Sequence, residues 1–265
     1  MGAAEQEYND KVTALCRACS DPVFISDYFL KDGHSEKTSN ATVTFVKCEG
    51  RHYACTCEHV ATADELKIDR RTLGLRAGRV IINLSWFHAN GLQTAFRNPP
   101  GIIEGDKVDV AIADISSSWA ILEEQKNKVA VDLDRWREPP WESIEYCAAA
   151  GYPNHHKERE GEMVASLMPV ATAALGAPLS RDARQFTLTS ALEEPHGIYF
   201  SGMSGGPIVG CLEKGPVPIG LIFEGMPSSP DAPASIYAGP NDIFIRGLLL
   251  RPQIFGAWLA TAELL

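Results

Sequence analysis

Apolar and polar residues alternate with a period of two from about residue 41 onward. The run TVTFVKC reaches Glu49-Gly50 and continues as RHYACTC, which is the pattern of two strands joined by a tight turn. A second run, RVIINLSWFHA, reaches Asn90-Gly91 and continues as LQTAF. Both patterns predict β-hairpins in the first half of the chain, and a short buried strand, VDVAIADI, follows at 108–115.

Strand-like segments resume after a polar, proline-containing stretch over 116–140, which we interpret as the link between two halves. They are IEYCAAAGYP, EMVASLMPVAT, RQFTLTSAL, GPIVGCL and VPIGLIFEG. Several short strands separated by turn residues predict an all-β sandwich or barrel. Helical patterns are expected near the two ends. One covers 5–19, and the other is the final segment NDIFIRGLLLRPQIFGAWLATAELL, interpreted as a helix interrupted near Pro252.

The composition is that of an ordinary globular chain. Its 265 residues, 45% of them hydrophobic and 22% charged, are enough to bury a core without metals or disulfides. A formal net charge of −10 argues against a nucleic acid or an anionic membrane as partner, because phosphate binding needs an excess of Lys and Arg. The sequence shows neither a secretory signal nor an apolar run of transmembrane length, so we expect a cytoplasmic protein.

The seven cysteines are an odd number, which favours reduced thiols over a disulfide framework. Cys16-Arg-Ala-Cys19 and Cys55-Thr-Cys57 could suggest zinc, but a structural site usually has two CxxC knuckles. We therefore expect Cys16 and Cys19 on one face of a short helix, and Cys55 and Cys57 on one side of a strand. Neither a metal nor a cofactor is predicted.

The strongest local motif is Gly202-Met203-Ser204-Gly205-Gly206-Pro207, between two strand-like segments. A serine nucleophile needs a base beside it and amides that stabilise the oxyanion, and glycines let the amides of Gly202 and Ser204 converge. The motif also fits the G-x-S-x-G elbow of α/β-hydrolases, in which the acid and the histidine follow the serine. All seven histidines precede Ser204, which excludes that fold unless another subunit supplies the base and leaves the order His, Asp, Ser.

The base is expected directly after the RHYACTC strand, in Cys57-Glu58-His59-Val60-Ala61. This segment resembles the TAAHV or TCRHV motif of trypsin-like serine peptidases, in which the histidine is the general base. His52 is the competing candidate, and its alternation with Ala54 indicates a half-exposed strand residue. Glu58 would raise the pKa of His59 slightly if it lies near the ring.

The acid and two later motifs follow the same resemblance. Asp109 opens Asp-Val-Ala-Ile-Ala, which is similar to the D-[IV]-A-[LI] segment of the family, whereas Asp106 and Asp114 are expected at a turn and at a strand end. Gly151-Tyr152-Pro153 resembles the turn that opens the second barrel of bacterial members. The segment 220–225, GLIFEG, resembles the strand that binds the substrate backbone.

The resemblance, to bacterial intracellular members of the family, covers about residues 38–250 and implies a chymotrypsin-like fold. This is an all-β fold of two six-stranded antiparallel β-barrels with short N-terminal and C-terminal helices. It implies a serine endopeptidase that uses His59, Asp109 and Ser204, with the amides of Gly202 and Ser204 as the oxyanion hole. The expected parts are an N-terminal helical extension (1–37), the first barrel (38–125), a linker (126–142), the second barrel (143–247) and a C-terminal helix (248–265).

Two departures from the family narrow the expected function. Secreted members carry Asp before the nucleophile to receive a new N-terminus, and Met203 stands there, so we predict no maturation by that route. We expect Ile198, Phe223, Glu224 and Gly225 to bind the substrate. Ile198 replaces an acid at the base of the pocket, which argues against strong selection for Arg or Lys. Glu224 could still attract a cationic side chain of the substrate, or it could be an exposed strand residue without a role in binding.

Three functions are consistent with these residues. The first is a serine endopeptidase with a protein or peptide substrate, restrained by narrow specificity, a regulatory protein partner or an unformed pocket. The second is a protease-fold binding module that is catalytically silent or latent. The third is an esterase that uses the same three residues, and only substrate profiling separates it from the first.

Overall fold

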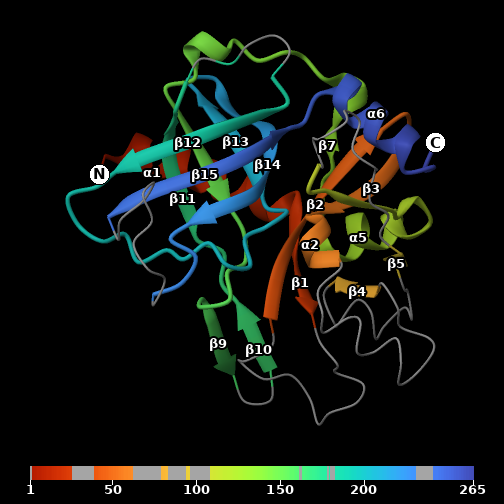
Figure 1. Ribbon diagram of the computed structural model, residues 1–265, viewed down its shortest axis with the longest axis horizontal. Coiled ribbons are helices and arrows are strands. Elements are labelled where there is room, and N and C mark those ends of the chain that lie inside the picture. Colours follow the sequence, from red (N-terminus) through yellow and green to blue (C-terminus); the bar gives the residue numbers. More distant parts are fainter. Residues whose placement is uncertain are drawn as a thin grey trace.

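Two β-structures lie side by side, with the N-terminus next to one of them and the C-terminus next to the other (Figure 1). The computed structural model describes residues 2–25, 39–61, 79–82, 94–95, 108–160, 163–177, 179, 183–230 and 241–265. For 24–25, 39–40, 79–82, 94–95, 157–160 and 163–165 the description covers the backbone alone.

The N-terminal β-structure is a sheet whose strands are hydrogen-bonded in the order β5-β4-β1-β2-β3-β6, and all of these pairs are antiparallel. The ends of this order, β5 and β6, lie close to each other, so the sheet curls strongly. A seventh strand, β7, pairs in parallel with β2, which the sequence did not predict. The strands are β1 Ser20–Ile25, β2 Ser39–Cys48, β3 Arg51–Thr56, β4 Arg79–Ile82, β5 Thr94–Ala95, β6 Ala111–Asp114 and β7 Val131–Asp132.

The hairpin predicted around Glu49-Gly50 is confirmed. β2 and β3 pair with Thr44 opposite Cys55, and the two turn residues have φ angles of 53° and 73°. Positive φ at both central residues is what a two-residue hairpin turn requires. In the second predicted hairpin, β4 and β5 pair with Arg79 opposite Ala95, while Asn90-Gly91 lies outside the described residues.

The C-terminal β-structure is a closed six-stranded barrel in the order β11-β12-β15-β14-β13-β8. Its antiparallel pairing and closure confirm the predicted all-β class and the second barrel. The predicted strand EMVASLMPVAT is divided: β10 pairs with β9 in a separate hairpin, and β11 enters the barrel. The strands are β8 Tyr146–Ala150, β9 Lys157–Glu160, β10 Met163–Ser166, β11 Val170–Leu175, β12 Gln185–Ala191, β13 Pro207–Leu212, β14 Gly215–Met226 and β15 Asp242–Leu249.

The interpretation of the final segment as an interrupted helix is wrong for its first part. Residues 242–249 form β15, which pairs with β12 on one side and with β14 on the other. Ile243 and Ile245 are buried and alternate with less buried neighbours, and this period-two pattern is that of a strand. The apolar run Leu248-Leu249-Leu250 suggested a helix, but the barrel buries both faces of the strand there. The helix begins only at Pro252.

Each terminal helix packs on the half of the molecule that is distant in sequence. Val12 and Cys16 of α1 join a buried cluster with Ala148 and Val209 of the barrel. Phe255 of α6 joins another with Tyr53 of the N-terminal sheet. The α-helices are α1 Ala3–Ala18, α2 Glu58–Ala61, α5 Trp119–Lys126 and α6 Pro252–Thr261, and the 3₁₀ turns are η1 Ser116–Ser118, η2 Leu133–Arg135 and η3 Trp141–Ser143.

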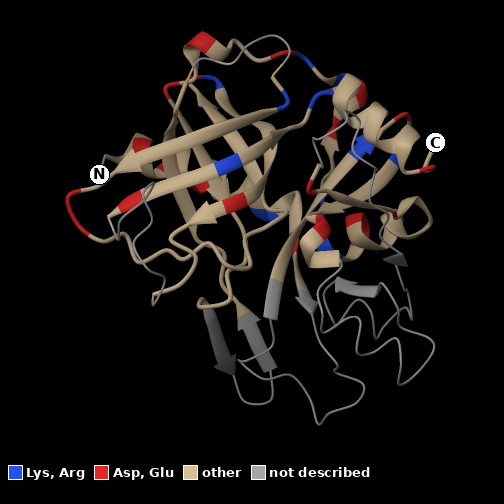
Figure 2. Cartoon of the chain, viewed as in Figure 1, with Lys and Arg blue, Asp and Glu red and all other residues tan. Residues whose placement is uncertain are grey.

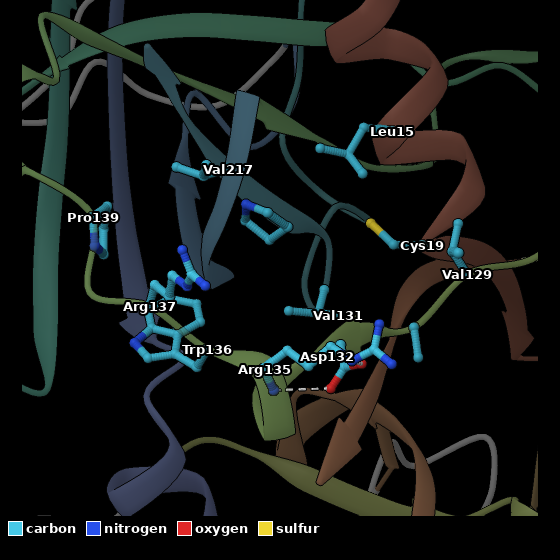
Figure 3. Close-up of a pocket in the computed structure, with 12 residues that line it drawn as sticks. Leu15, Cys19, Val129, Val131, Asp132, Arg135, Trp136, Arg137, Pro139 and Val217 are labelled. Carbon is cyan, nitrogen blue, oxygen red and sulfur yellow. Dashed lines mark hydrogen bonds and ion pairs between the residues drawn. The ribbon is translucent and has the colours of Figure 1, made fainter. Parts of the chain in front are cut away.

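The stretch interpreted as a link contains regular structure, because α5 and β7 both fall within 116–140. A pocket of about 300 Å³ lies where this stretch passes between α1 and the start of β14 (Figure 3). Leu15, Val131, Trp136 and Val217 line it. Val131 and Leu133 of the linking stretch are buried in one cluster with Tyr53 of the N-terminal sheet and Leu221 of the barrel, so the stretch packs against both halves of the molecule. The exact domain boundaries stay a prediction.

All seven cysteines are free and buried. Cys16 lies in the last turn of α1 and Cys19 is the residue that caps it, so the prediction of one shared helix face holds only in part. Cys16 packs in the cluster of Val12, and Cys19 packs in the cluster of Tyr53. Cys57 differs from the prediction: it follows the end of β3 and packs in the cluster of Ala54, whereas Cys55 packs in the cluster of Tyr53 on the other side.

Charged positions are spread over both β-structures in the view of Figure 2, without a block of one sign. Of the helices that the structure describes, none is both long enough and apolar enough to cross a membrane.

Candidate active site

His59 and Asp109 come from two neighbouring elements of the N-terminal sheet. β3 ends at Thr56, and the short helix α2 then carries His59. Asp109 lies just before β6, where the buried side chains of Val108 and Val110 fix the backbone on either side of it. The amide of His59 donates to Oδ1 of Asp109 (3.1 Å), and Nδ1 of the ring lies 2.7 Å from Oδ2. Both carboxylate oxygens therefore hold the same histidine.

Ser204 reaches this pair from the other half of the molecule. It lies in the loop that precedes β13, and its Oγ is 3.2 Å from Nε2 of His59. The fold thus brings together three side chains that are distant in sequence: Asp109 and Ser204 follow His59 by 50 and 145 residues. This order of contacts, acid to Nδ1 and hydroxyl to Nε2, is the geometry of a nucleophile, base and orienting acid.

The competing residues lie elsewhere or outside the described part of the chain. His52 is in β3, where its ring stacks on Trp119 with centroids 4.4 Å apart. Asp114 forms an ion pair with Arg51, and it also accepts a hydrogen bond from the amide of Ser116 at the end of β6 (2.8 Å). Asp106 lies outside the described residues.

The electrostatics of the pair favour a charged acid next to a basic imidazole. The hydrogen bond with Asp109 raises the pKa of His59 against the opposing effect of burial, and the charges of Asp109 and Glu58 add to the increase. Burial works against ionisation of Asp109, but the hydrogen bonds from His59 outweigh it and hold the pKa of Asp109 below its usual value. The small contribution expected of Glu58 is confirmed.

The loop that carries Ser204 leaves two amides free to bind an oxyanion. The amides of Met203, Gly205 and Gly206 donate to the carbonyls of Phe200, Ile222 and Met203, at 2.9, 2.7 and 2.8 Å. Within the part of the chain that the structure describes, the amides of Gly202 and Ser204 have no such acceptor. Gly202 and Gly205 have φ angles of 97° and 87°, a conformation that glycine adopts without strain.

Cys57 lies beneath the nucleophile, which the sequence did not predict. Its Sγ donates to the carbonyl of Ile222 (3.4 Å) and interacts with the Ser204 side chain. Possible ligand atoms of Cys57, His59 and Asp109 all lie within 4.8 Å of one another, and no other such group occurs among the described residues. Burial raises the pKa of the thiol well above its usual value.

The four residues expected to bind substrate lie on two segments that run side by side. The amides of Phe200 and Ser201 donate to the carbonyls of Pro227 and Ser228 (2.9 and 3.1 Å). Ile198, on the first segment, is half-buried. Gly225, on the second, lies so close to the ring of Phe200 that a Cβ atom would approach it to 2.6 Å. A side chain at position 225 would therefore displace this wall.

Phe223 and Glu224 are oriented by other contacts. Phe223 is half-buried and packs on the apolar clusters of the N-terminal sheet. Nη1 of Arg246 is 2.9 Å from Oε2 of Glu224, and its guanidinium lies over the ring of Phe223 at 4.8 Å. Glu224 is therefore partly neutralised, which agrees with an exposed strand residue more than with a site for a cation.

Comparisons with known proteins give matches in structure alone. Neither family models nor curated protein sequences match the chain. A thermostable serine protease, AL20, from an extremophilic microorganism has a TM-score of 0.47 and 14% identity, covering 93% of this chain and 98% of its own. The protease Anisep from Arthrobacter nicotinovorans has a TM-score of 0.45 and 15% identity, covering 93% and 96%. Both are proteases. Identities this low carry no conclusion about activity, so the chemistry of the site rests on its own geometry.

Proposed function

We propose that the protein is a serine endopeptidase. The observation that carries the proposal is the convergence of three groups on Ser204: the imidazole of His59, the carboxylate of Asp109 behind it, and the two unengaged amides of the loop. A hydroxyl in hydrogen-bond reach of a base, with donors for the developing oxyanion, is what acyl transfer requires.

The reaction follows from these positions. His59 accepts the proton of the Ser204 hydroxyl at Nε2 as Oγ attacks the carbonyl carbon of a peptide bond. The negative charge that develops on the carbonyl oxygen is stabilised by the amides of Gly202 and Ser204. His59 then donates its proton to the leaving amine, which gives an acyl-enzyme, and water cleaves the ester by the same steps in reverse. Asp109 keeps Nδ1 protonated and stabilises the imidazolium.

The substrate class is a peptide with an uncharged residue before the cleaved bond. Ile198 supplies no charge at the expected base of the pocket, and Arg246 already pairs with the carboxylate of Glu224. A cationic substrate side chain would meet no unpaired acid among these residues. Protein or peptide chains remain the proposed partners, and the site has no need of a cofactor.

Labelling with a fluorophosphonate probe tests the proposal, because the probe reacts only with an activated serine. The purified full chain should be labelled at Ser204, and Ser204→Ala should abolish labelling and lower peptide cleavage at least about 10⁴-fold. Ser116→Ala, a matched change in a turn remote from His59, should leave both unchanged.

A peptide library digested by the wild type and by Ser204→Ala would at the same time report the preferred residue before the cleaved bond. Equal cleavage by the two proteins would refute the proposal. Absence of labelling in the wild type would favour a silent or latent binding module instead. Labelling with turnover of esters but not of peptides would favour an esterase.

A further inference from the structure

Thr42 of β2 makes three hydrogen bonds that cross from the N-terminal sheet to the barrel. Its Oγ1 donates to the carbonyl of Gly202 (3.0 Å) and accepts from the amide of Tyr152 (2.9 Å). Its backbone amide donates to the carbonyl of Ser204 (3.0 Å). Thr42 is completely buried, so water cannot replace these partners. One residue thus holds the carbonyl groups of both residues whose amides would bind the oxyanion.

Thr42 is closely surrounded by segments of the barrel. A Cβ atom at Gly151 would come within 2.9 Å of both Oγ1 of Thr42 and Cα of Met203. Met203 itself is completely buried in the barrel core. The turn at 151–152, the threonine and the loop of Ser204 therefore approach one another too closely to admit a side chain at Gly151.

Every carbonyl of the loop has a donor. The carbonyls of Gly202 and Ser204 accept from Thr42, that of Met203 accepts from Gly206, and that of Gly205 accepts from the hydroxyl of Thr44 (2.7 Å). A carbonyl shares its peptide plane with the amide of the next residue. The bond at Met203 therefore fixes the plane of the Ser204 amide, and the carbonyl of Ser201, which accepts from the amide of Asn154 (2.8 Å), fixes the plane of the Gly202 amide. Thr42 holds the plane between these two through the carbonyl of Gly202. Glycine alone would not do this, because it rotates between positive and negative φ at little cost.

From this geometry we propose that Thr42 is a positioning residue for the oxyanion hole. Its hydroxyl holds the peptide plane between residues 202 and 203, which separates the planes that carry the amides of Gly202 and Ser204, and so sets the direction of one amide relative to the other. Without the hydroxyl, this middle plane can rotate, and the two amides no longer converge on one oxygen. The inference rests on the proposed peptidase function, and it assigns a residue of the N-terminal half to the geometry of the nucleophile loop.

Thr44 provides a matched comparison. It lies on the same face of β2, is completely buried, and donates its hydroxyl to a carbonyl of the same loop. That carbonyl belongs to Gly205, which is one residue beyond Ser204 and contributes no oxyanion amide. Thr42→Val and Thr44→Val are therefore the same substitution at equal burial, and they differ in their relation to the oxyanion hole. Thr42→Val also removes the acceptor of the Tyr152 amide, so it loses two hydrogen bonds and Thr44→Val loses one.

The test is the second-order rate of fluorophosphonate labelling of the full chain, together with the thermal unfolding midpoint. We expect Thr42→Val to label about 10 to 100 times more slowly than the wild type, since displaced oxyanion donors cost rates of this order. Thr44→Val, which loses one buried hydrogen bond and not two, should lower the midpoint by a smaller amount and slow labelling no more than about threefold. Thr42→Ser, which keeps the hydroxyl, should label within about threefold of the wild type, and Thr42→Ala should not.

The outcomes separate the two proposals. No labelling of the wild type would overturn the peptidase function and this inference with it. Labelling of the wild type at the rate of Thr42→Val would overturn the inference alone, as would equal slowing by Thr42→Val and Thr44→Val. If Thr42→Val does not fold, the pair Thr42→Ser and Thr42→Ala makes the same test, and equal rates for these two would also overturn it.

Discussion

The two halves of the molecule contribute to the site in different ways. The N-terminal sheet supplies His59 and Asp109, which are joined to each other by two hydrogen bonds within that half. The barrel supplies Ser204 on a glycine-rich loop, and two threonines of the other half hold several of that loop's carbonyl groups. His59 and Asp109 form a locally complete pair, whereas the loop that carries Ser204 depends on the contact between the halves.

Because of this difference, substitutions in the two regions should have different effects on activity and on stability. Changes to the base and acid should alter the chemistry and leave the fold largely intact. Changes where the loop meets β2 should alter both, because the same buried hydrogen bonds position the amides and join the halves. The cross-packing of α1 and α6, each on the half distant in sequence, has the same consequence for the association of the two halves.

The largest effect is expected at Asp109. Asp109→Asn keeps the shape of the side chain but removes the charge that orients and stabilises the imidazolium. We expect the turnover of a peptide substrate to fall by about 10⁴-fold, with little change in the thermal midpoint. Asp114→Asn is the control, because Asp114 belongs to the same strand region and pairs with Arg51 instead. A loss below tenfold for Asp109→Asn would show that the pair is not the catalytic unit.

The pH profile of the same variant sharpens this prediction. Only neutral His59 can accept a proton, so activity should fall as the pH is lowered through the pKa of His59, which lies above the usual value of about 6.5. In Asp109→Asn the midpoint of the remaining activity should move to lower pH. The stability of the fold depends on pH in the opposite direction. The ion pair of protonated His59 with Asp109 contributes fully to the free energy of unfolding below pH ~6.5, and this contribution is lost as the pH rises through the raised pKa of His59. An unchanged midpoint in the variant would contradict the assignment.

The next effect concerns the contact between the loop and the sheet. Gly205 has a φ of 87°, and a Cβ atom there would overlap the carbonyl of Thr42 and approach Oγ1 of Thr56 to 2.7 Å. Gly205→Ala should therefore destabilise the fold by about 2–5 kcal/mol and slow fluorophosphonate labelling by about 100-fold or more.

Gly50→Ala is the control for the cost of placing a non-glycine residue at positive φ. Gly50 has a φ of 73°, and no atoms lie within 4 Å of the added Cβ. It should cost about 1–2 kcal/mol and leave the labelling rate unchanged. Chemical denaturation and labelling kinetics measure both quantities. Equal destabilisation by the two variants would mean that the loop does not pack on β2 as described.

The sequence was sufficient to predict the parts of the site that are local. The turn at Glu49-Gly50 predicted the first hairpin, and the end of the strand before His59 predicted where that histidine lies. The order of the histidines argued against an α/β-hydrolase fold in a chain that supplies its own base. Each of these depends on a few adjacent residues. The final strand was missed because its apolar run near Leu249 fits a buried strand as well as a helix, and only the two partner strands decide between them.

The support of the nucleophile loop could not be predicted from the pattern. Thr42 and Thr44 alternate with Val43 and Phe45, which indicates a strand with one apolar face and one face toward water. In the structure both faces are buried, because the threonine face lies against the loop of Ser204. Threonine fits either setting, so the pattern alone carries no signal of which face the other half covers.

The smallest effect is expected at Glu224 on the wall of the barrel. A substitution there changes the charge that a substrate would meet and leaves the geometry of the Ser204 loop unchanged. Arg246→Ala removes the partner of Glu224, whose side chain is 39% exposed. If Glu224 faces the substrate, the freed carboxylate should raise the kcat/KM for peptides with Lys before the cleaved bond by about threefold relative to those with Leu, since exposed ion pairs contribute up to ~1 kcal/mol.

Arg135→Ala changes the net charge equally at a position on the linking stretch, and it should leave the ratio of the two peptides unchanged. Adding Glu224→Gln to Arg246→Ala should return the ratio to that of the wild type, because the carboxylate is then absent. A ratio that stays constant through all three variants would remove Glu224 from the substrate-binding wall, and it would place the selectivity of the barrel in Ile198 and Gly225. His59 and Asp109 of the N-terminal half would be unaffected in either case, because a charge on the barrel wall changes substrate preference without changing the contact between the halves.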